Sequence, residues 1–166
     1  MLKIVKGSVV DMHVDAIVNA AKPSLLGGGA VDGAIHRAAG PKLLEECKTL
    51  GGAKTGEAKI TGAYNIDYAK HIIHTVGPVY KKGQDNASLL ASCYKNSLDL
   101  AVKYDCKSIA FPCISTGVYG YPIKEAAAVV MKAIDAWIKD NPSVELEIYL
   151  CCFRDEEYAA YMEIEG

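Results

Sequence analysis

Apolar residues along the chain fall into short runs that alternate with stretches of helical period. The short runs predict β-strands at residues 2–5, 16–18, 56–61, 71–76, 108–112 and 144–152. Apolar positions at helical spacing predict helices that begin near Val31, include residues 43–47, and cover residues 86–104, 122–140 and 157–164. Asn86 is the expected N-cap of the first long helix, and Pro122 the expected first residue of the second.

Strands that alternate with helices are typical of an α/β fold. We therefore expect a three-layer α/β/α sandwich with a mixed, mostly parallel sheet, in which the first two strands could form an antiparallel edge. No internal repeat or linker interrupts residues 1–166, so the chain is expected to form a single domain.

A glycine-rich stretch, NAAKPSLLGGGAVDGAIHRAAG at residues 19–40, joins the second predicted strand to a helix. Glycines let the backbone approach a ligand closely, and the unpaired N–H groups at a helix start favour phosphate or pyrophosphate. Such loops are also common as plain connections. The string is neither a P-loop, because no Gly-Lys-Ser/Thr follows, nor a GxGxxG fingerprint. Asp32 in the first helical turn is either a helix-start charge or a base beside a bound phosphate.

A second glycine-rich loop, CISTGVYGYP at residues 113–122, follows the buried strand at 108–112 and also precedes a helix. In α/β sheets ligands bind beyond the carboxyl ends of the strands, so we expect the two loops to face one another across a diphosphate. Tyr119 and Tyr121 could supply apolar walls for a sugar or a base, or pack in the core.

Composition restricts the function further. The net charge of −2 gives no excess of Lys and Arg to neutralise phosphates, so sequence-general nucleic-acid binding is not expected. Binding of a single nucleotide-sized ligand remains expected. No apolar run suits a signal peptide or a membrane span, which favours a cytoplasmic protein. The six cysteines form no CxxC pairs, which argues against a zinc site. His71 and His74 are interpreted as structural.

Three blocks carry a specific resemblance: DAIVNAA with LLGGG and VDGAIHRAAG, then IIHTVGP, then SIAFPCISTGVYGYP. In this order and over nearly the whole chain they resemble the macrodomain family, in particular its MacroD-like branch. The resemblance implies a domain that binds ADP-ribose or ADP-ribosylated protein, without metal or cofactor. In that branch it also implies removal of ADP-ribose from acidic side chains, or cleavage of acetyl from O-acetyl-ADP-ribose.

Site residues follow from the same resemblance, position by position. Asp32 is similar to the family's carboxylate that positions or deprotonates a water, and a substrate phosphate oxygen is a second candidate for that task. The resemblance implies Asp32, Asn19 and Lys22 as catalytic residues. The implied ligand-binding residues are Ser8, Val9, Ala21, Gly27, Gly28, Gly29, Ala30, Val31, Ser115, Thr116, Gly117, Val118, Tyr119 and Phe153, of which Phe153 stands where the family often stacks adenine.

The chain departs from the family pattern at three positions. Ser8 replaces the aspartate that usually accepts from the adenine amino group, and Ala30 replaces a fourth glycine. Lys22 replaces an asparagine that contacts the distal ribose; its ammonium offers donors but no acceptor, and could approach the diphosphate or pair with Asp32.

Three hypotheses therefore remain. The leading one is an ADP-ribose ester hydrolase that acts as a monomer. A second is a non-catalytic reader of ADP-ribose, in which Lys22 impairs catalysis. A third is an unrelated α/β enzyme that uses a dinucleotide, against which the missing GxGxxG counts.

Overall fold

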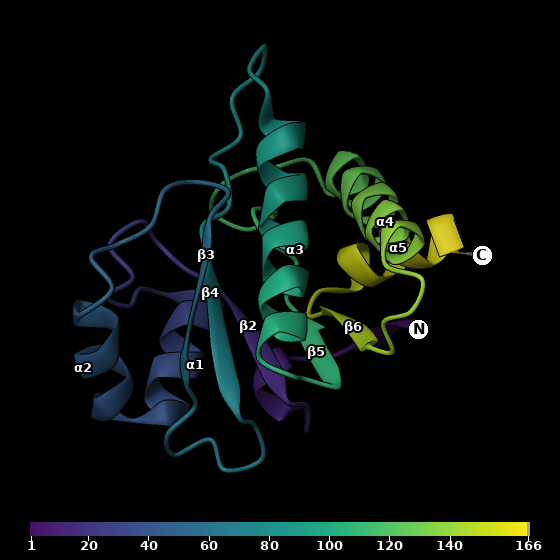
Figure 1. Cartoon of the computed structure of the whole chain (residues 1–166). Helices are drawn as coiled ribbons and strands as arrows, with labels where there is room; N and C mark the ends of the chain where they lie inside the picture. Colours follow the sequence, from purple (N-terminus) through teal and green to yellow (C-terminus); the bar gives the residue numbers. More distant parts are fainter. Residues whose placement is uncertain (166) are drawn as a thin grey trace.

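The computed structural model describes residues 1–165 and contains one six-stranded sheet covered by helices on both faces (Figure 1). Its elements in chain order are β1 (Leu2–Lys6), a 3₁₀ turn η1 (Val9–Asp11), β2 (Ala16–Ala20), α1 (Ala30–Ala39), α2 (Pro41–Lys48), β3 (Ala58–Gly62), β4 (His71–Thr75), α3 (Asn86–Lys103), β5 (Ser108–Phe111), α4 (Ile123–Asp140), β6 (Glu147–Cys152) and α5 (Asp155–Glu165). The expected α/β sandwich is confirmed.

The strand order is β1-β6-β5-β2-β4-β3. All neighbours pair in parallel except β3, which runs antiparallel to β4. A mixed, mostly parallel sheet is therefore confirmed, but the antiparallel edge is β3 and not the β1–β2 pair. The short connections on either side of η1 carry the chain from one edge to the sheet centre, so β1 and β2 never become neighbours.

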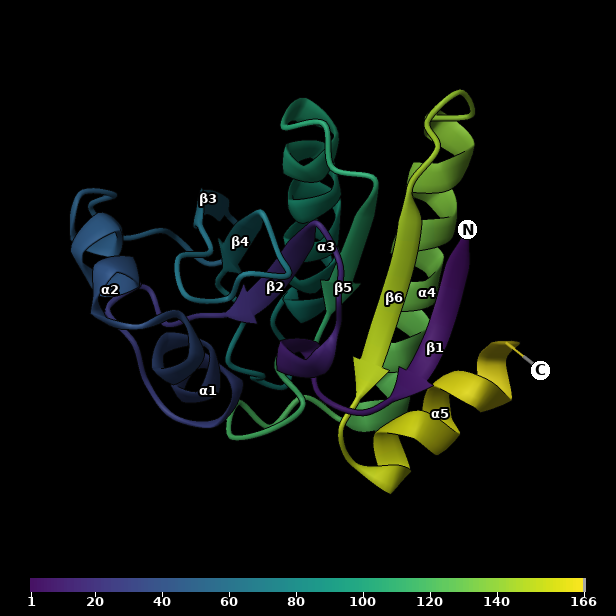
Figure 2. The same ribbon diagram turned by 90° about the horizontal axis from the view of Figure 1, so that it is seen from below.

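Two apolar cores lie on the two faces of the sheet. In Figures 1 and 2 α3 and α4 run side by side along one face, while α1 and α2 lie together on the other. The central strands β2, β4 and β5 are nearly continuous in buried residues, because both of their faces are covered. α5 packs against α4 and the edge strand β1.

Several boundaries differ from the sequence prediction. Asp85, not Asn86, caps α3: its side chain accepts from Ser88 N at 3.1 Å, and Asn86 is instead a buried first helical residue. Pro122 is the N-cap of α4 rather than its first helical residue. The last strand begins only at Glu147, and α5 begins at Asp155, before the apolar pattern starts.

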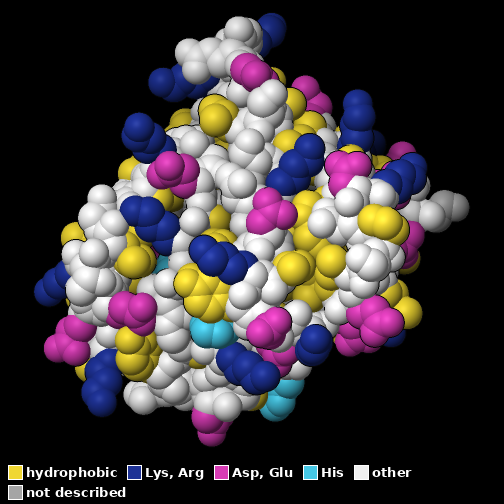
Figure 3. Space-filling view, in the orientation of Figure 1, with side chains coloured by type: hydrophobic (Ala, Val, Ile, Leu, Met, Phe, Trp, Pro, Cys, Tyr) yellow, Lys and Arg dark blue, Asp and Glu magenta, His cyan; other side chains and the backbone are white. Residues whose placement is uncertain are grey.

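The surface over α3 and α4 carries interspersed charges of both signs (Figure 3). Among the described residues no helix is long and apolar enough to cross a membrane.

Candidate functional site

A cavity of about 320 Å³ lies at the carboxyl ends of the central strands, between the two glycine-rich loops. Its lining comprises Ala20, Ala21, Lys22, Gly29, Ala30, Val31, Asp32, Gly77, Cys113, Ile114, Ser115, Gly117, Val118 and Tyr119. The two loops thus face one another, as the sequence predicts. A cavity of similar volume lies at the sheet edge between β3 and α3, but neither glycine-rich loop lines it. We therefore assign the candidate site to the cavity between the loops.

Close backbone packing shapes the first loop, residues 21–29. Leu25 is buried and anchors the loop, with a positive φ of 62°. A Cβ on Gly33 would come within 2.7 Å of the Gly28 carbonyl oxygen, so only glycine lets α1 start this close to the loop. Ala30 also has a positive φ, 51°, a backbone conformation that favours glycine, in line with the fourth glycine that the family resemblance implies here.

Behind the cavity, a buried polar cluster holds one side of the Asp32 carboxylate. Asn19 in β2 donates from Nδ2 to Asp32 Oδ1 at 2.9 Å, and the same Nδ2 lies 3.1 Å from His74 Nδ1 on the neighbouring strand β4. His36 Nε2 lies 3.4 Å from Asp32 Oδ1, an ion-pair distance without hydrogen-bond geometry. Asp32 Oδ2 is buried and, within residues 1–165, has no hydrogen-bond partner. One carboxylate oxygen is therefore fixed and the other is left without a partner, in a residue that lines the cavity.

His74 remains neutral in this cluster. Burial first, and then the nearby His36, lowers its pKa to about 3. Its Nε2 lies 2.9 Å from Thr61 Oγ1, a hydroxyl that can accept from an Nε2–H group. Nδ1 is then the acceptor for the Asn19 amide, so the interpretation of His74 as structural extends to orienting Asn19.

Lys22 lines the cavity but forms no ion pair with Asp32 among the described residues. The suggested Lys22–Asp32 pair is therefore not formed in this structure. Its Cε and Asp32 Oδ2 each lie 3.0 Å from the point that a Cβ on Gly28 would occupy. Lys22 thus lies over the loop near the free carboxylate oxygen, with an exposed side chain.

The second loop, residues 115–119, is held from the side of β4. Ser115 has a positive φ of 71° and donates from Oγ to the Pro78 carbonyl at 2.8 Å. Tyr80 N donates to the Tyr119 carbonyl at 2.9 Å. Within residues 1–165, the backbone N–H groups of Gly117, Val118 and Tyr119 donate no hydrogen bond, so they are available to an anion.

Ser8 and Phe153 follow the ends of the paired strands β1 and β6, where Gly7 N donates to the Cys152 carbonyl at 3.0 Å. The Ser8 hydroxyl accepts from Val10 N at 3.4 Å and caps η1, while Phe153 is 72% exposed. Val9 is buried in the core beside α1, so its side chain serves packing. These residues lie outside the cavity lining.

Several residues of the site escaped the sequence analysis. Gly77, in the HTVGP string, lies so close to the second loop that an added Cβ would overlap Ile114 and Ser115. The i, i+4 spacing of Asp32 and His36 predicts that the two side chains lie on one face of a helix. Nothing in the sequence shows that the two side chains are buried together. For Tyr121, which the sequence analysis placed either as a wall or in the core, the structure shows core packing against Tyr80, with ring centroids 5.0 Å apart.

Among the described residues, no group of three or more His, Cys, Asp or Glu side chains is arranged to hold a metal ion. The six cysteines are free, and burial raises the pKa of Cys47 to about 11. The chemistry that the site offers is therefore a carboxylate, backbone donors and one lysine.

Comparison with known proteins gives a consistent result. The Macro domain family matches residues 18–130. A Macro domain-containing protein of Chlorobaculum tepidum is 53% identical over 164 residues, which cover 98% of this chain and 94% of the relative. The Rattus norvegicus ADP-ribose glycohydrolase MACROD1 is 48% identical over 165 residues, which cover 98% of this chain and 63% of the relative.

Solved structures agree with the sequence relatives. An Oceanobacillus iheyensis macrodomain with ADP superposes with a TM-score of 0.92 at 42% identity, covering 98% of this chain and 88% of that one. A Trypanosoma brucei macrodomain in complex with ADP-ribose gives a TM-score of 0.91 at 41% identity, covering 99% of this chain and 69% of that one. From the extent of the family match and the identity to its relatives, the chain belongs to the Macro domain family.

Proposed function

We propose that this protein binds ADP-ribose in the cavity between the two loops and hydrolyses esters of ADP-ribose. The substrate class is mono-ADP-ribosylated acidic side chains or O-acetyl-ADP-ribose. The observation that carries the proposal is Asp32, which lines the cavity and whose buried Oδ2 has no hydrogen-bond partner among residues 1–165. The relatives named ADP-ribose glycohydrolases and the neighbour in complex with ADP-ribose support it.

The order of the strand ends supports one orientation of the ligand. Along the sheet the order is β1, β6, β5, β2, so the carboxyl ends present in turn Ser8, Phe153, the second loop and the first loop. Adenine would lie near Phe153, the diphosphate against the free N–H groups of the second loop and the start of α1, and the distal ribose beside Asp32.

In the reaction that we propose, Asp32 Oδ2 accepts a proton from a water while Oδ1 stays bonded to Asn19. The water oxygen forms a bond to the ester carbonyl carbon or to the anomeric carbon. The bond to the leaving oxygen then breaks with its electron pair on that oxygen: a carboxylate leaves as the anion, and a ribose oxygen takes up the proton that Asp32 accepted. Asn19 keeps the carboxylate in one orientation, which is the contribution that its buried position favours.

One observation favours a second candidate, a non-catalytic reader of ADP-ribose. Lys22 lines the cavity near Asp32 Oδ2, where it can pair with that oxygen or with the ligand diphosphate once a ligand is bound. A reader would bind ADP-ribose and release no product.

Calorimetric titration with ADP-ribose followed by single-turnover hydrolysis of an ADP-ribosylated acidic protein separates these candidates. We expect the wild-type protein to bind ADP-ribose and to hydrolyse the substrate at a measurable rate. The hydrolysis rate should fall by about a hundredfold or more in Asp32→Ala and should rise in Lys22→Asn. Affinity in Lys22→Asn should stay within a few-fold. Binding without turnover in wild type would favour the reader, and a slower Lys22→Asn would make the lysine itself part of catalysis. No binding of ADP-ribose would refute both candidates.

A further inference from the structure

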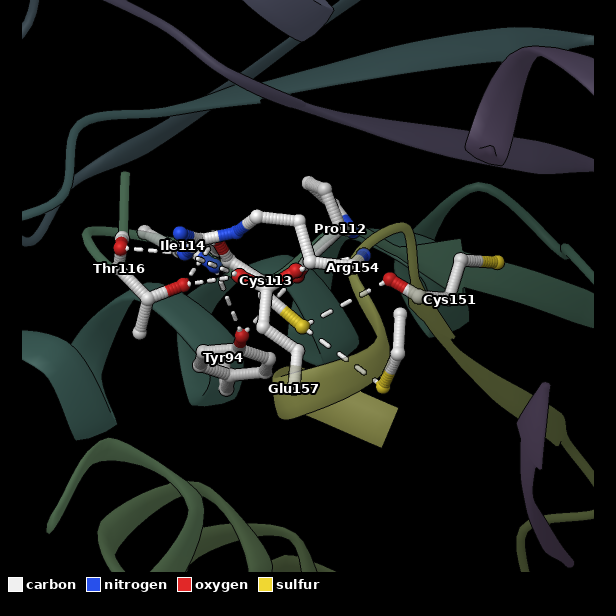
Figure 4. Close-up of polar contacts among 9 residues, drawn as sticks. Tyr94, Pro112, Cys113, Ile114, Thr116, Cys151, Arg154 and Glu157 are labelled. Atoms are coloured by element: carbon white, nitrogen blue, oxygen red, sulfur yellow. Dashed lines mark hydrogen bonds and ion pairs between the residues drawn. The ribbon is translucent and has the colours of Figure 1, made fainter. Parts of the chain in front are cut away.

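The second loop is also held by a hydrogen-bond network from α5 and the residue before it, in which Glu157 is buried and Arg154 is partly exposed (Figure 4). Glu157 Oε2 accepts from Thr116 Oγ1 at 2.6 Å and from Arg154 Nη2 at 3.0 Å. Arg154 Nη2 also donates to the Thr116 carbonyl at 2.6 Å, and Arg154 N donates to Glu157 Oε1 at 3.2 Å. Two residues of α5 and its approach thus contact both the side chain and the backbone of Thr116.

The Glu157 carboxylate serves both the start of α5 and the loop, because it accepts from Arg154 N just before the helix and from Thr116 Oγ1. Its side chain is buried, and a buried carboxylate is stable only when its oxygens are paired and hydrogen-bonded. Both oxygens have partners here, and the hydrogen bond from the guanidinium raises the pKa of Arg154 above its ordinary value. All of these contacts lead to Thr116 or stay within the network, so the charge pair fixes one point of the loop.

Neither Glu157 nor Arg154 lines the cavity. Thr116 lies between them and the loop tip, whose Gly117 and Val118 line the cavity with free N–H groups. On the opposite side the loop is tied to Pro78 and Tyr80. The loop tip is therefore held on both sides before a ligand binds, which lowers the entropy cost of ordering the loop on binding.

We propose that Glu157 and Arg154 are positioning residues that hold the second loop in the shape that binds the ligand diphosphate. The inference rests on the proposed function, because it assigns the loop to ADP-ribose. The network also joins the loop to the residue that follows Phe153, so the adenine and diphosphate parts of the site share one support.

The test compares wild type with Glu157→Ala, Arg154→Gln and the control Glu163→Ala, which makes the same change at an exposed glutamate of α5. Titration calorimetry with ADP-ribose measures Kd, and ¹⁵N NMR of the ligand-free proteins measures the order of the amides of residues 116–119. Thermal unfolding followed by circular dichroism reports the fold. We expect Kd to rise about tenfold in Glu157→Ala, as for loss of a charge-assisted hydrogen bond, and three- to tenfold in Arg154→Gln. The loop amides should become more mobile in both variants, and the control should match wild type.

A role in global stability alone would lower the unfolding midpoint but leave Kd and loop order unchanged, and that result would overturn the inference. If Glu157→Ala does not fold, Arg154→Gln decides, since it leaves the Glu157–Thr116 bond in place. If wild type binds no ADP-ribose, the proposed function fails. The NMR comparison then still decides whether the network orders the loop: unchanged amide order in Arg154→Gln rejects it.

Discussion

Asn19 uses the two protons of one amide nitrogen on two different partners, Asp32 Oδ1 and His74 Nδ1. A protonated His74 would present an N–H to that amide in place of an acceptor, and the bond would be lost. The orientation of Asp32 thus depends on a neutral imidazole one strand away.

This dependence predicts how stability varies with pH. The pKa of His74 is about 3 in the folded protein and about 6.5 when exposed, so the unfolded chain binds the extra proton between these values. The stability that the neutral state of His74 contributes is fully present above about pH 6.5 and is lost on acidification towards pH 3. Over this range the free energy of unfolding falls with a slope that approaches about 1.4 kcal/mol per pH unit. Urea unfolding at about pH 7 and about pH 5 should show a smaller pH dependence in His74→Gln than in wild type. Equal dependence in the two proteins would contradict the neutral, buried state of His74.

Gly77 is a second residue on which the site depends. A methyl group there would overlap Ile114 and Ser115, so Gly77→Ala must displace the second loop. We expect a loss of about 1–3 kcal/mol in the free energy of unfolding and at least tenfold weaker binding of ADP-ribose.

Gly62→Ala serves as the control for this change. Its new methyl group would meet only ordinary contacts, at 3.6 Å or more, and should leave affinity unchanged. Urea unfolding and calorimetry measure the two effects. Wild-type affinity in Gly77→Ala would show that the loop accommodates the methyl group without a change in the site.

At the scale of elements, the site consists of strand ends followed by turns. η1 is one of these turns, and Ser8 both caps it and occupies the position where the resemblance to the family implies an aspartate. Aspartate is as good an N-cap as serine, so the turn should tolerate the exchange.

We therefore expect Ser8→Asp to tighten ADP-ribose binding by about three- to tenfold, because a carboxylate accepts a stronger hydrogen bond from the adenine amino group than a hydroxyl does. Ser8→Asn keeps the cap without the charge and should give a smaller gain. Titration calorimetry measures both variants. A weaker complex in Ser8→Asp would place adenine elsewhere.

Element types and the two facing loops could be predicted from the sequence, since buried strands and amphipathic helices have distinct periods. The strand order could not, because periodicity does not tell whether β1 pairs with β2 or with β6. The same holds for the site. The glycines and Asp32 are visible as a local string. Glu157 and His74 join the site only through contacts with residues far away in the sequence, Thr116 at a separation of 41 residues and Asn19 at a separation of 55.

At the scale of the whole molecule, we propose that the chain unfolds as a single unit. Trp137, the one tryptophan in the sequence, is buried on the α3–α4 side and donates to Asp99 Oδ1 at 2.8 Å. The strands pass between both cores, so the two faces should lose structure together. Tryptophan fluorescence and far-ultraviolet circular dichroism should then give coincident urea transitions. Two separate midpoints would mean that the two faces are independent units.

The pairing of β1 with β6 has a consequence for synthesis. Leu2 lies opposite Ile148, so β1 leaves the ribosome well before β6, the strand with which it pairs. Until β6 has emerged, β1 and the turn that carries Ser8 have no edge to join, while β2, β4 and β5 can already assemble. The adenine end of the site should therefore be the last part to form on the growing chain, and a nascent chain that stops before β6 should lack it.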